Sequence, residues 1–445
     1  MLLLNPLRRR AGIVDGFPLV RGAFPLLGHI PALASDTLEL VRRTEREVGS
    51  LFFIDAGFGH RMMICAHLDA LSVFQTKAAS NDYMRRASGG MFGESVIVHD
   101  GKPHQRMRAV LNGSFTPRGL SAAAVAPMIA DIVERRVRGW ARGVPLKMLA
   151  ETRELALDVV FRIVGIDDPD LSEWRRKYED ALLLLVNLPI DAPGTPRRRG
   201  RLGKAWIDAR LHDKIRRARE RRGGDEAGEG LLATLVGAKG EGGETLSDDE
   251  LVDNLRLLML AGHETSASTM AWIVAFLADH PEAWERLVVE AKKLGHVPRT
   301  AVELKDLEYA EAVFREALRL NPPVAVDARR LTGPIELCGR TIPEGTQLGI
   351  PVIHLSRHRD LHARPDSFEP ERWLGAKSAL TPLELIQFGG GPHFCLGYHL
   401  AWMEIVQFTV ALALFLPSRP RLIGGMPAAR YAPLLHPSMS LRVSV

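Results

Sequence analysis

Residues 388–397 read Phe-Gly-Gly-Gly-Pro-His-Phe-Cys-Leu-Gly, and this stretch is the most informative part of the 445-residue chain. Its glycines and its proline predict a tight, irregular loop. Cys395 follows, and the apolar segment from Leu396 to Phe415 predicts a helix. A thiol at a helix N-terminus feels the helix dipole and free backbone N–H groups, which lower its pKa. The loop alone leaves three roles open for Cys395: a nucleophile, a ligand of a soft metal, or a buried structural thiol.

The longest helical pattern precedes this loop and covers about residues 248–280. Ser247 and Glu250 fit a capping box at its start, and Pro281 stops it. At 1.5 Å per residue such a helix spans roughly 50 Å. Its middle, residues 255–275, is mostly apolar, so we expect much of it to be buried on all sides.

Strand patterns are few and short. Apolar runs around two glycines in residues 51–65 predict a β-hairpin, and residues 335–351 predict a second strand-and-turn region. No linker and no internal repeat divides the chain. The sequence therefore predicts a mainly α fold with a small β region, with residues 1–16 as an N-terminal tail and residues 17–445 as a single large domain.

The cysteine loop resembles the heme-binding signature of the cytochrome P450 family, Phe-Gly-x-Gly-x-His-x-Cys-x-Gly, at every fixed position. Residues 24–29, Phe-Pro-Leu-Leu-Gly-His, also resemble family members, so the similarity runs from about residue 17 to the C-terminus. The resemblance implies the cytochrome P450 fold and heme b (iron protoporphyrin IX), with Cys395 thiolate as the iron ligand. It also implies that Phe388 packs near the sulfur and that Gly397 lets the following helix approach the porphyrin.

The two propionates of a heme need cationic or hydrogen-bonding partners inside the protein. His104 and Arg108 share a helix face at i and i+4 and resemble the family's His-x-x-x-Arg pattern. His393 is the histidine of the cysteine loop, and Arg329 stands where the family places an arginine on its third strand. The neighbouring Arg330 remains an alternative to Arg329.

Residues 261–265, Ala-Gly-His-Glu-Thr, interrupt the apolar middle of the long helix. A mid-helix glycine costs about 1 kcal/mol relative to alanine, and an acid and a hydroxyl in apolar surroundings need partners. The segment resembles the family's Ala-Gly-x-(Asp/Glu)-Thr motif over the distal face of the heme. The resemblance implies that Gly262 leaves room for dioxygen, that Thr265 hydrogen-bonds the oxygen co-substrate, and that Glu264 feeds protons towards it. His263 takes the variable position, and the His-Glu-x-x-His spacing of a zinc site is absent.

Glu316 and Arg319 lie at i and i+3 on a helix predicted at residues 311–320, which resembles the family's Glu-x-x-Arg helix. Residues 368–373 resemble its Pro-Glu-Arg-Phe segment, with Trp in place of Phe. The resemblance implies a buried network of Glu316, Arg319 and Arg372. Because its role would be structural, these residues stay outside the predicted catalytic set.

Composition narrows the class of protein. The three cysteines stand far apart in sequence, which gives no disulfide framework and fits a reducing compartment. Met1-Leu2-Leu3-Leu4 is too short for a signal peptide or a membrane span, and no later segment reaches 18 apolar residues without a charge. We expect a cytoplasmic protein without a membrane anchor.

The net charge of +5 is mild for so long a chain. Residues 197–204 form a basic cluster, but no aromatic residues interleave these charges. We expect a solvated loop there and no nucleic-acid binding.

The resemblance implies a monooxygenase that inserts one atom of O2 into an apolar small molecule by hydroxylation or epoxidation. The chain has no Gly-x-Gly-x-x-Gly unit, so electrons from NAD(P)H would arrive through a ferredoxin or flavodoxin-type donor with its reductase. Two alternatives are a peroxide-driven or isomerising heme-thiolate enzyme and a non-catalytic heme-thiolate sensor or binding protein. Glu264 and Thr265 argue against both, because neither needs a proton relay. We expect a monomer.

Three segments are predicted to contact the substrate. They are residues 83–98, residues 182–196, and the long helix before Gly262. The first two combine apolar side chains with glycine or proline, which allows a slot to open without unfolding the core. Leu257, Leu258 and Leu260 are the candidate wall residues on the helix.

Overall fold

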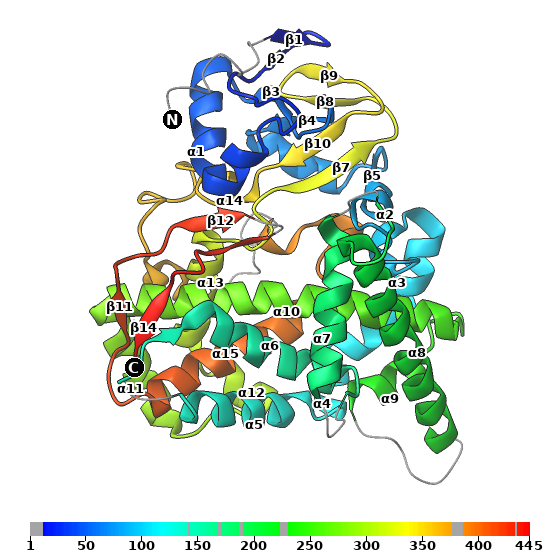
Figure 1. Cartoon of the computed structure of the whole chain (residues 1–445). Coiled ribbons are helices and arrows are strands. Elements are labelled where there is room, and N and C mark those ends of the chain that lie inside the picture. The colour runs from blue at the N-terminus through cyan, green and yellow to red at the C-terminus, as the bar shows by residue number, and fades with distance from the viewer. Residues whose placement is uncertain are drawn as a thin grey trace.

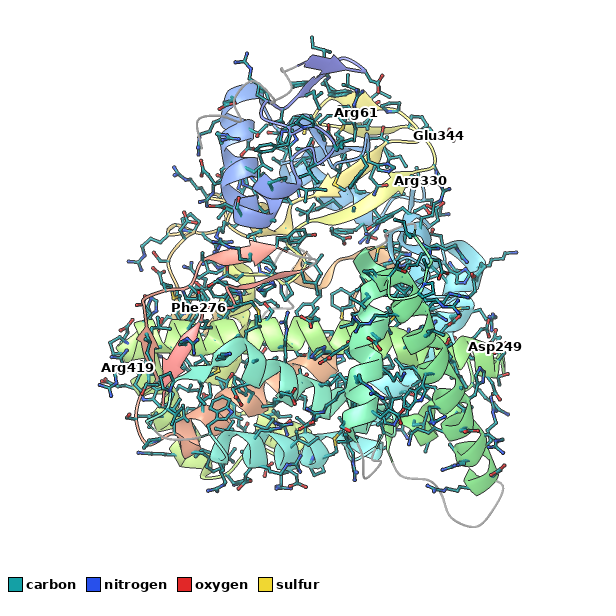
Figure 2. The ribbon with its side chains drawn as sticks, in the orientation of Figure 1. Arg61, Asp249, Phe276, Arg330, Glu344 and Arg419 are labelled. Carbon is teal, nitrogen blue, oxygen red and sulfur yellow. The ribbon has the colours of Figure 1, made fainter. Side chains whose placement is uncertain are left out.

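The computed structural model describes residues 12–140, 143–166, 171–186, 190–222, 230–375, 386–431 and 434–445. A mixed sheet with helix α1 occupies one end of the molecule, and a larger helical body occupies the other (Figure 1; with side chains, Figure 2). The helices are α1 Ile30–Val48, α2 Tyr83–Ala87, α3 Gly101–Phe115, α4 Pro117–Ala122, α5 Val125–Arg138, α6 Met148–Ile163, α7 Leu171–Leu182, α8 Pro196–Arg222, α9 Leu231–Val236, α10 Asp248–Asp279, α11 Pro281–Leu294, α12 Ala301–Lys305, α13 Glu308–Leu320, α14 Val352–Leu355 and α15 Tyr398–Phe415. The predicted mainly α fold with a small β region is confirmed.

Short 3-10 helices and strands connect these elements. The 3-10 helices include η2 Leu68–Phe74, η3 Val96–Val98, η4 Leu183–Val186, η5 Pro370–Trp373, η6 Ile386–Phe388 and η7 Gly391–His393. The strands are β1 Gly12–Val14, β2 Phe17–Leu19, β3 Leu51–Asp55, β4 Arg61–Cys65, β5 Ala79–Ser80, β6 Leu146–Lys147, β7 Asp327–Leu331, β8 Ile335–Leu337, β9 Arg340–Ile342, β10 Gln347–Ile350, β11 Arg421–Ile423, β12 Ala429–Tyr431, β13 Leu435–Pro437 and β14 Arg442–Ser444.

The main sheet has the strand order β1-β2-β3-β4-β10-β7-β5. Strands β3 and β4 pair antiparallel, with Leu51 opposite Cys65 at one end and Asp55 opposite Arg61 at the other. This pairing confirms the predicted hairpin. Strand β10 runs parallel to β4 and antiparallel to β7, and so joins the second predicted β region to the first. Strand β1 lies within the predicted N-terminal tail and pairs with β2.

Helix α10 crosses the helical body from one side to the other (Figure 1). Ser247 accepts from the backbone N–H of Glu250, whose side chain accepts from the N–H of Ser247, so the predicted capping box is present. Helix α10 packs against α6, α8 and α15. Most of its apolar residues are buried, as the uniformly apolar middle of the helix predicted.

The buried network around Glu316 is also present. Arg319 donates to both carboxylate oxygens of Glu316 at 2.8 Å, and Arg372 of η5 donates to Oε1 at 3.0 Å. The indole N–H of Trp373 donates to Oε2 at 2.9 Å. Tryptophan in place of the family's phenylalanine therefore adds a hydrogen-bond donor to this network.

Two predictions need correction. The basic cluster at residues 197–204 forms the first turns of α8, where Arg199 pairs with Asp180 and Lys204 with Asp208, both at 2.6 Å. The prediction of a loop was wrong because the segment is helical, but its basic side chains are solvated as expected: Arg199 is 59% and Arg201 55% exposed. The helix predicted from Leu396 begins at Tyr398, so Cys395 precedes α15 by three residues.

Helix α15 is the one helix in the described part of the chain that is long and apolar enough to cross a membrane. Two thirds of it is buried, and it packs against α5, α10, α11 and α13. Its apolar character is explained by its place in the core of the helical body.

Candidate active site around Cys395

Cys395 ends a loop made of η6 and η7. Its backbone N–H donates to the carbonyl of Phe388 at 2.9 Å, which closes the loop. Gly391 has φ = +61°, and a Cβ at this position would lie 1.8 Å from the backbone oxygen of Phe74. The predicted tight loop is therefore confirmed, and glycine at position 391 is required both by its backbone conformation and by the close approach of η2.

The thiol of Cys395 lies deep inside the protein and still has solvent-accessible surface. Burial raises its pKa, while the backbone N–H of Gly397 and the charge of Arg108 lower it. The residues from 387 to 402 are accessible too, although the rest of α15 is largely buried. Accessible surface this deep lines an internal cavity, and the loop with the first turn of α15 forms one wall of it.

Helix α10 supplies a second accessible strip in the interior. Leu258, Ala261 and Thr265 share one helix face. Ala261 is exposed and Leu258 and Thr265 are partly accessible, whereas the later residues 266–278 are buried. Next to Thr265, the hydroxyl of Ser266 donates to Glu404 of α15 at 2.7 Å, so the two walls belong to adjoining helices. A flat, mostly apolar prosthetic group would cover both walls, and the residues present therefore fit a heme.

Helix α3 brings His104 and Arg108 to the cysteine loop. The rings of His104 and His393 lie with centroids 4.2 Å apart and are tilted by 42° to each other. Burial, together with the charges of His393 and Arg108, lowers the pKa of His104 to about 4. Arg108 is half-buried, interacts electrostatically with Cys395, and has no hydrogen bond or ion pair among the described residues. An unpaired, half-buried guanidinium is what a heme propionate needs, so this geometry supports the predicted fit.

The other two predicted propionate partners already bind carboxylates. His393 lies 3.0 Å from Oδ1 of Asp100, through Nε2. Arg329 is buried, donates to Asp327 at 2.6 Å, and lies over the ring of Phe74 next to the cysteine loop. A propionate would therefore share His393 and Arg329 with these two aspartates.

Arg330 faces away from this arrangement. Its guanidinium pairs with Asp82 and is 38% exposed, whereas Arg329 is buried. Consecutive residues of a strand point to opposite faces of a sheet. The structure therefore places Arg329, and not Arg330, beside the loop of Cys395.

Glu264 and Thr265 lie side by side on α10 but have different partners. Arg153 of α6 donates to Oε2 of Glu264 at 2.9 and 3.2 Å. The hydroxyl of Thr265 donates to the carbonyl of Ala261 at 2.5 Å. The predicted acid and hydroxyl are thus present, but Glu264 is held by an arginine 111 residues away that sequence reasoning missed.

His263 belongs to the same polar group on the buried side of α10. Its Nδ1 lies 3.3 Å from the hydroxyl of Tyr178, its Nε2 lies 3.1 Å from the carbonyl of Arg153, and burial lowers its pKa to about 4. These contacts explain how a histidine is accommodated at the variable position of the motif.

The backbone at Gly262 lies close to helix α6. A Cβ built on Gly262 would lie 2.9 Å from Cγ2 of Val160. Close helix packing is therefore one reason for a glycine here, while its role in making room for dioxygen stays a prediction.

The three predicted substrate segments lie in different surroundings. The first contains α2 and η3 and is tied to α10, because Arg256 donates to the carbonyl of Met91 at 2.6 Å and Asp253 accepts from the N–H of Glu94 at 2.7 Å. In the second, residues 187–189 lie outside the described residues. In the third, Leu257 is buried, while Leu258 and Leu260 are partly accessible and are the better candidates for a pocket wall.

Comparison with known proteins identifies a single family. The family model for cytochrome P450 matches residues 18–416. The chain is 42% identical to cytochrome P450 BJ-4 of Bradyrhizobium diazoefficiens, with 99% of each chain covered. It is 30% identical to cyclooctat-9-en-7-ol 5-monooxygenase of Streptomyces melanosporofaciens, over 88% of this chain and 87% of that protein.

Solved structures agree with the sequence comparisons. Retinoic acid-bound cyanobacterial CYP120A1 gives a TM-score of 0.81 at 26% identity, with 95% of this chain and 97% of that chain covered. The heme domain of cytochrome P450DA gives a TM-score of 0.80 at 20% identity, over 95% and 96% of the two chains, and shows the same fold.

Proposed function

Because the chain belongs to the cytochrome P450 family, we propose that it inserts one atom of O2 into an apolar organic molecule. One observation carries this proposal. Arg108, which has no hydrogen bond or ion pair among the described residues, interacts electrostatically with Cys395, and Ser266 beside Thr265 bonds Glu404 of α15, the helix that follows the loop of Cys395. A thiolate, a free cation and a hydroxyl in this arrangement suit a heme with an oxygen-binding distal side.

Each residue has a separate task in the proposed mechanism. Bound heme would supply the activation of O2 and the transfer of one oxygen atom to the substrate. Cys395 would hold the heme iron, and His104, Arg108, Arg329 and His393 would bind the propionates. These residues act by fixing the position of the heme between the two walls.

Proton delivery falls to Glu264 and Thr265. Glu264 is 17% exposed, so water can reach its carboxylate and supply the proton. Rotation of its side chain away from Arg153 would carry that proton towards Thr265. The Thr265 hydroxyl would pass it on, exchanging its present bond to Ala261 for one directed into the cavity.

The proposed substrate is mid-sized and mostly hydrocarbon. One relative is named for cyclooctat-9-en-7-ol, and one structural neighbour holds retinoic acid, and each molecule has a large apolar skeleton with a single polar group. The accessible Leu258 and Leu260 on α10 and the partly buried Leu182, Leu183 and Leu185 give apolar walls suited to such a molecule.

Substrate selectivity can be tested within the leucine run. Leu183→Ala and Leu185→Ala should change substrate affinity or product distribution and leave the reduced-CO spectrum intact. Leu184 is buried and contacts the backbone of α8, so Leu184→Ala is the control that should lower stability alone. Unchanged selectivity in the first two variants would place the pocket elsewhere.

The electrons would come from a separate acidic iron–sulfur or flavin protein with its own NAD(P)H-dependent reductase. The net charge of +5 supports an acidic donor, with docking on the side of Cys395. Reduction rates that do not fall with rising ionic strength would remove electrostatic steering from this proposal.

The decisive experiment is optical. The reduced, CO-bound protein should show the red-shifted Soret band of thiolate ligation, and Cys395→Ala should lose both this band and the activity. Cys338→Ser, at a more accessible cysteine outside the loop, is the matched control and should keep both. Survival of the band in Cys395→Ala would refute the ligand assignment, and substrate-dependent O2 uptake tied to NAD(P)H would distinguish a monooxygenase from a peroxide-driven enzyme or a sensor.

A further inference from the structure

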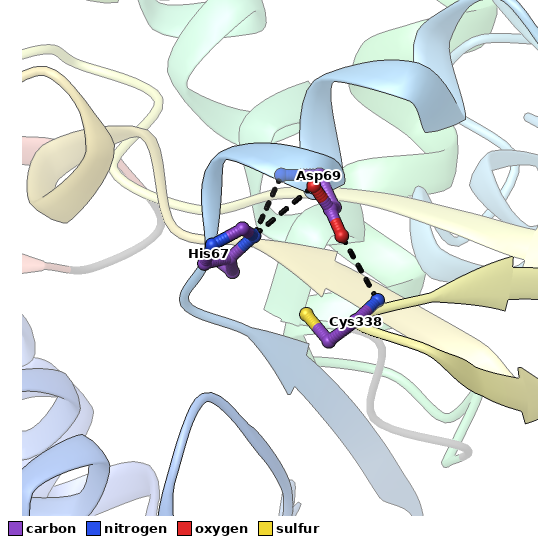
Figure 3. Close-up of side chains that lie close together, drawn as sticks. All are labelled: His67, Asp69 and Cys338. Atoms are coloured by element: carbon purple, nitrogen blue, oxygen red, sulfur yellow. Dashed lines mark hydrogen bonds and ion pairs between the residues drawn. The ribbon is translucent and has the colours of Figure 1, made fainter.

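The fold brings together three metal-binding side chains, with a fourth next to Cys338, beyond the end of strand β4. Cys65 ends strand β4, and His67 and Asp69 follow at the start of η2. Cys338 lies in the turn between β8 and β9, nearly 270 residues later in sequence (Figure 3). The ligand atoms of His67, Asp69 and Cys338 all lie within 4.8 Å of one another.

Hydrogen bonds hold these side chains in place. One carboxylate oxygen of Asp69 accepts from the backbone N–H of Cys338 at 2.9 Å. The other lies 3.1 Å from Nδ1 of His67, which also accepts from the N–H of Asp69 at 3.2 Å. Figure 3 shows the sulfur of Cys338 on the side of the turn that faces His67. The cluster is therefore already assembled, and little ordering remains for an ion to impose.

Cys338 has an unusual backbone conformation for a cysteine. Leu337 and Arg340 pair across the β8–β9 hairpin, so Cys338 and Gly339 form its two-residue turn, with φ of +51° and +70°. Positive φ at both central positions favours Asn, Asp or Gly at the first one. Cysteine has no such conformational advantage, so its presence here needs another reason.

Cys65 supplies a second sulfur beneath the cluster. It is fully buried, and its thiol lies within side-chain hydrogen-bonding reach of the thiol of Cys338. His67 and Asp69 are about half exposed, so an ion has access from solvent on the opposite side. The four side chains thus combine a closed inner side with an open outer side.

We propose that Cys338, His67 and Asp69, with Cys65 as the fourth ligand, bind a thiophilic divalent cation of the Zn²⁺ type at a site separate from the heme. Thiolate, imidazole and carboxylate together are the ligand set that Zn²⁺ accepts in tetrahedral coordination. Mg²⁺ and Ca²⁺ require oxygen ligands and are excluded by the two sulfurs.

Binding at this site should release protons. Cys65 and Cys338 must each lose a thiol proton to act as ligands. Only thiolates ligate the ion, and its affinity should therefore rise with pH.

The site would fasten together two distant parts of the chain. It would tie the start of η2 to the β8–β9 hairpin, and Phe74 at the other end of η2 packs against Gly390 and Gly391 of the cysteine loop. Zn²⁺ should therefore raise the midpoint of thermal unfolding of the holoprotein.

The test uses reduced, heme-loaded full-length protein treated with a chelator and then titrated with Zn²⁺ by calorimetry. We expect one ion per chain in the wild type, and binding weaker by roughly tenfold or more in Cys338→Ser and in His67→Gln. His212→Ala removes another exposed histidine that pairs with an aspartate, Asp249, at 3.2 Å, and should bind like the wild type. An intact reduced-CO band in each variant shows that it is folded.

Two outcomes would overturn the proposal. Equal Zn²⁺ binding by the wild type, Cys338→Ser and His67→Gln would mean that the ion binds elsewhere. If the reduced protein takes up no Zn²⁺, while mild oxidation joins Cys65 and Cys338 in a disulfide, the two thiols form a redox pair and not a metal site.

Discussion

The Glu316–Arg319 pair on α13 and the Glu264–Arg153 pair between α10 and α6 use the same two side chains in different surroundings. Glu316 is 0% exposed and accepts five hydrogen bonds, two of them from Arg319. Glu264 is 17% exposed, and among the described residues its hydrogen bonds come from Arg153 alone, with Nδ1 of His263 3.5 Å away.

This difference separates a fixed network from one that can change partners. Burial alone would raise the pKa of Glu316, yet hydrogen bonds from Arg319 and the N–H of Glu369, with the charge of Arg372, bring it below its ordinary value. No single bond there can be broken without leaving a buried charge unpaired. Glu264 can leave Arg153 and be solvated in the cavity, which is what a proton relay requires.

Breaking the fixed network of Glu316, Arg319 and Arg372 should have the largest effect on turnover. Arg319→Ala leaves the Glu316 carboxylate buried with its main cation removed, at a cost of about 3–5 kcal/mol of stability. We expect little heme-loaded protein, measured by the reduced-CO band per milligram and by the midpoint of denaturant unfolding.

Arg315→Ala is the matched control for this prediction. Arg315 lies on the same helix and pairs with Glu311 one turn away at 2.7 Å, in a partly exposed position. Its loss should cost less than about 1 kcal/mol. A stable and fully heme-loaded Arg319→Ala protein would contradict the structural role of the network.

Removing the acid of the Glu264–Arg153 pair should slow the reaction and spare the fold. Glu264→Gln keeps the shape of the side chain but removes proton transfer, so turnover should fall by roughly 10²-fold. Heme content and substrate affinity should stay as in the wild type. Asp249→Asn, at a 91% exposed position near the start of the same helix, is the control. Equal turnover in Glu264→Gln and wild type would exclude Glu264 from the relay.

Sequence predicted those parts of the fold that depend on local pattern. The capping box of Ser247 and Glu250 and the hairpin of β3 and β4 were predicted correctly, because neighbouring residues determine both. The basic residues 197–204 were misread, because their helix is stabilised by carboxylates on α7 and on α8 itself. Composition of the segment alone does not contain that information.

In the candidate site, too, local motifs were readable from the sequence and contacts between distant residues were not. The motifs predicted Cys395, Glu264 and Thr265 as site residues, and their shared role around a heme stays a prediction. The structure shows Glu264 and Thr265 side by side on α10 and Cys395 just before α15. It also shows partners that no motif contains, such as Arg153 for Glu264 and Asp327 for Arg329. Cys65 and Cys338 appeared as unrelated cysteines in the sequence, because only the pairing of β4 with β10 brings Cys65 to the β8–β9 hairpin that precedes β10. Long-range pairs of this kind are set by tertiary packing.

The hydroxyl of Thr265, next to Glu264, offers a finer test of the proposed proton relay. Thr265→Ala removes the group that would pass the proton on, but leaves the apolar walls that bind the substrate. We expect NAD(P)H consumption to continue with hydrogen peroxide replacing much of the product. Thr265→Ser keeps the hydroxyl and should restore most of the coupling, measured as product formed per NAD(P)H oxidised. Unchanged coupling in Thr265→Ala would remove this hydroxyl from the mechanism.

A third buried carboxyl, Glu404 of α15, extends the comparison to a group without a cation. Its Oε2 accepts from the hydroxyl of Ser266 at 2.7 Å, and its Oε1 has no partner among the described residues. Burial raises the pKa of Glu404 to about 8, and the bond from Ser266 offsets only part of this rise. The carboxyl is therefore protonated at neutral pH, in contrast to Glu316 with its five donors.

Glu404→Gln should have the smallest effect on turnover, because Glu404 touches neither Cys395 nor Thr265, but it should change how stability depends on pH. In the unfolded chain Glu404 loses its proton near its ordinary pKa of 4.5, whereas the folded protein keeps it up to about pH 8. The folded state binds the extra proton across this window, so rising pH lowers the free energy of unfolding by roughly 1.4 kcal/mol per pH unit. Glutamine cannot titrate and lacks this contribution.

The unfolding free energies of the wild type and Glu404→Gln should therefore diverge in favour of Glu404→Gln as pH rises from about 5 to about 8. Parallel curves over that range would mean that Glu404 is ionised in the folded protein, through a donor to Oε1 such as a bound water molecule.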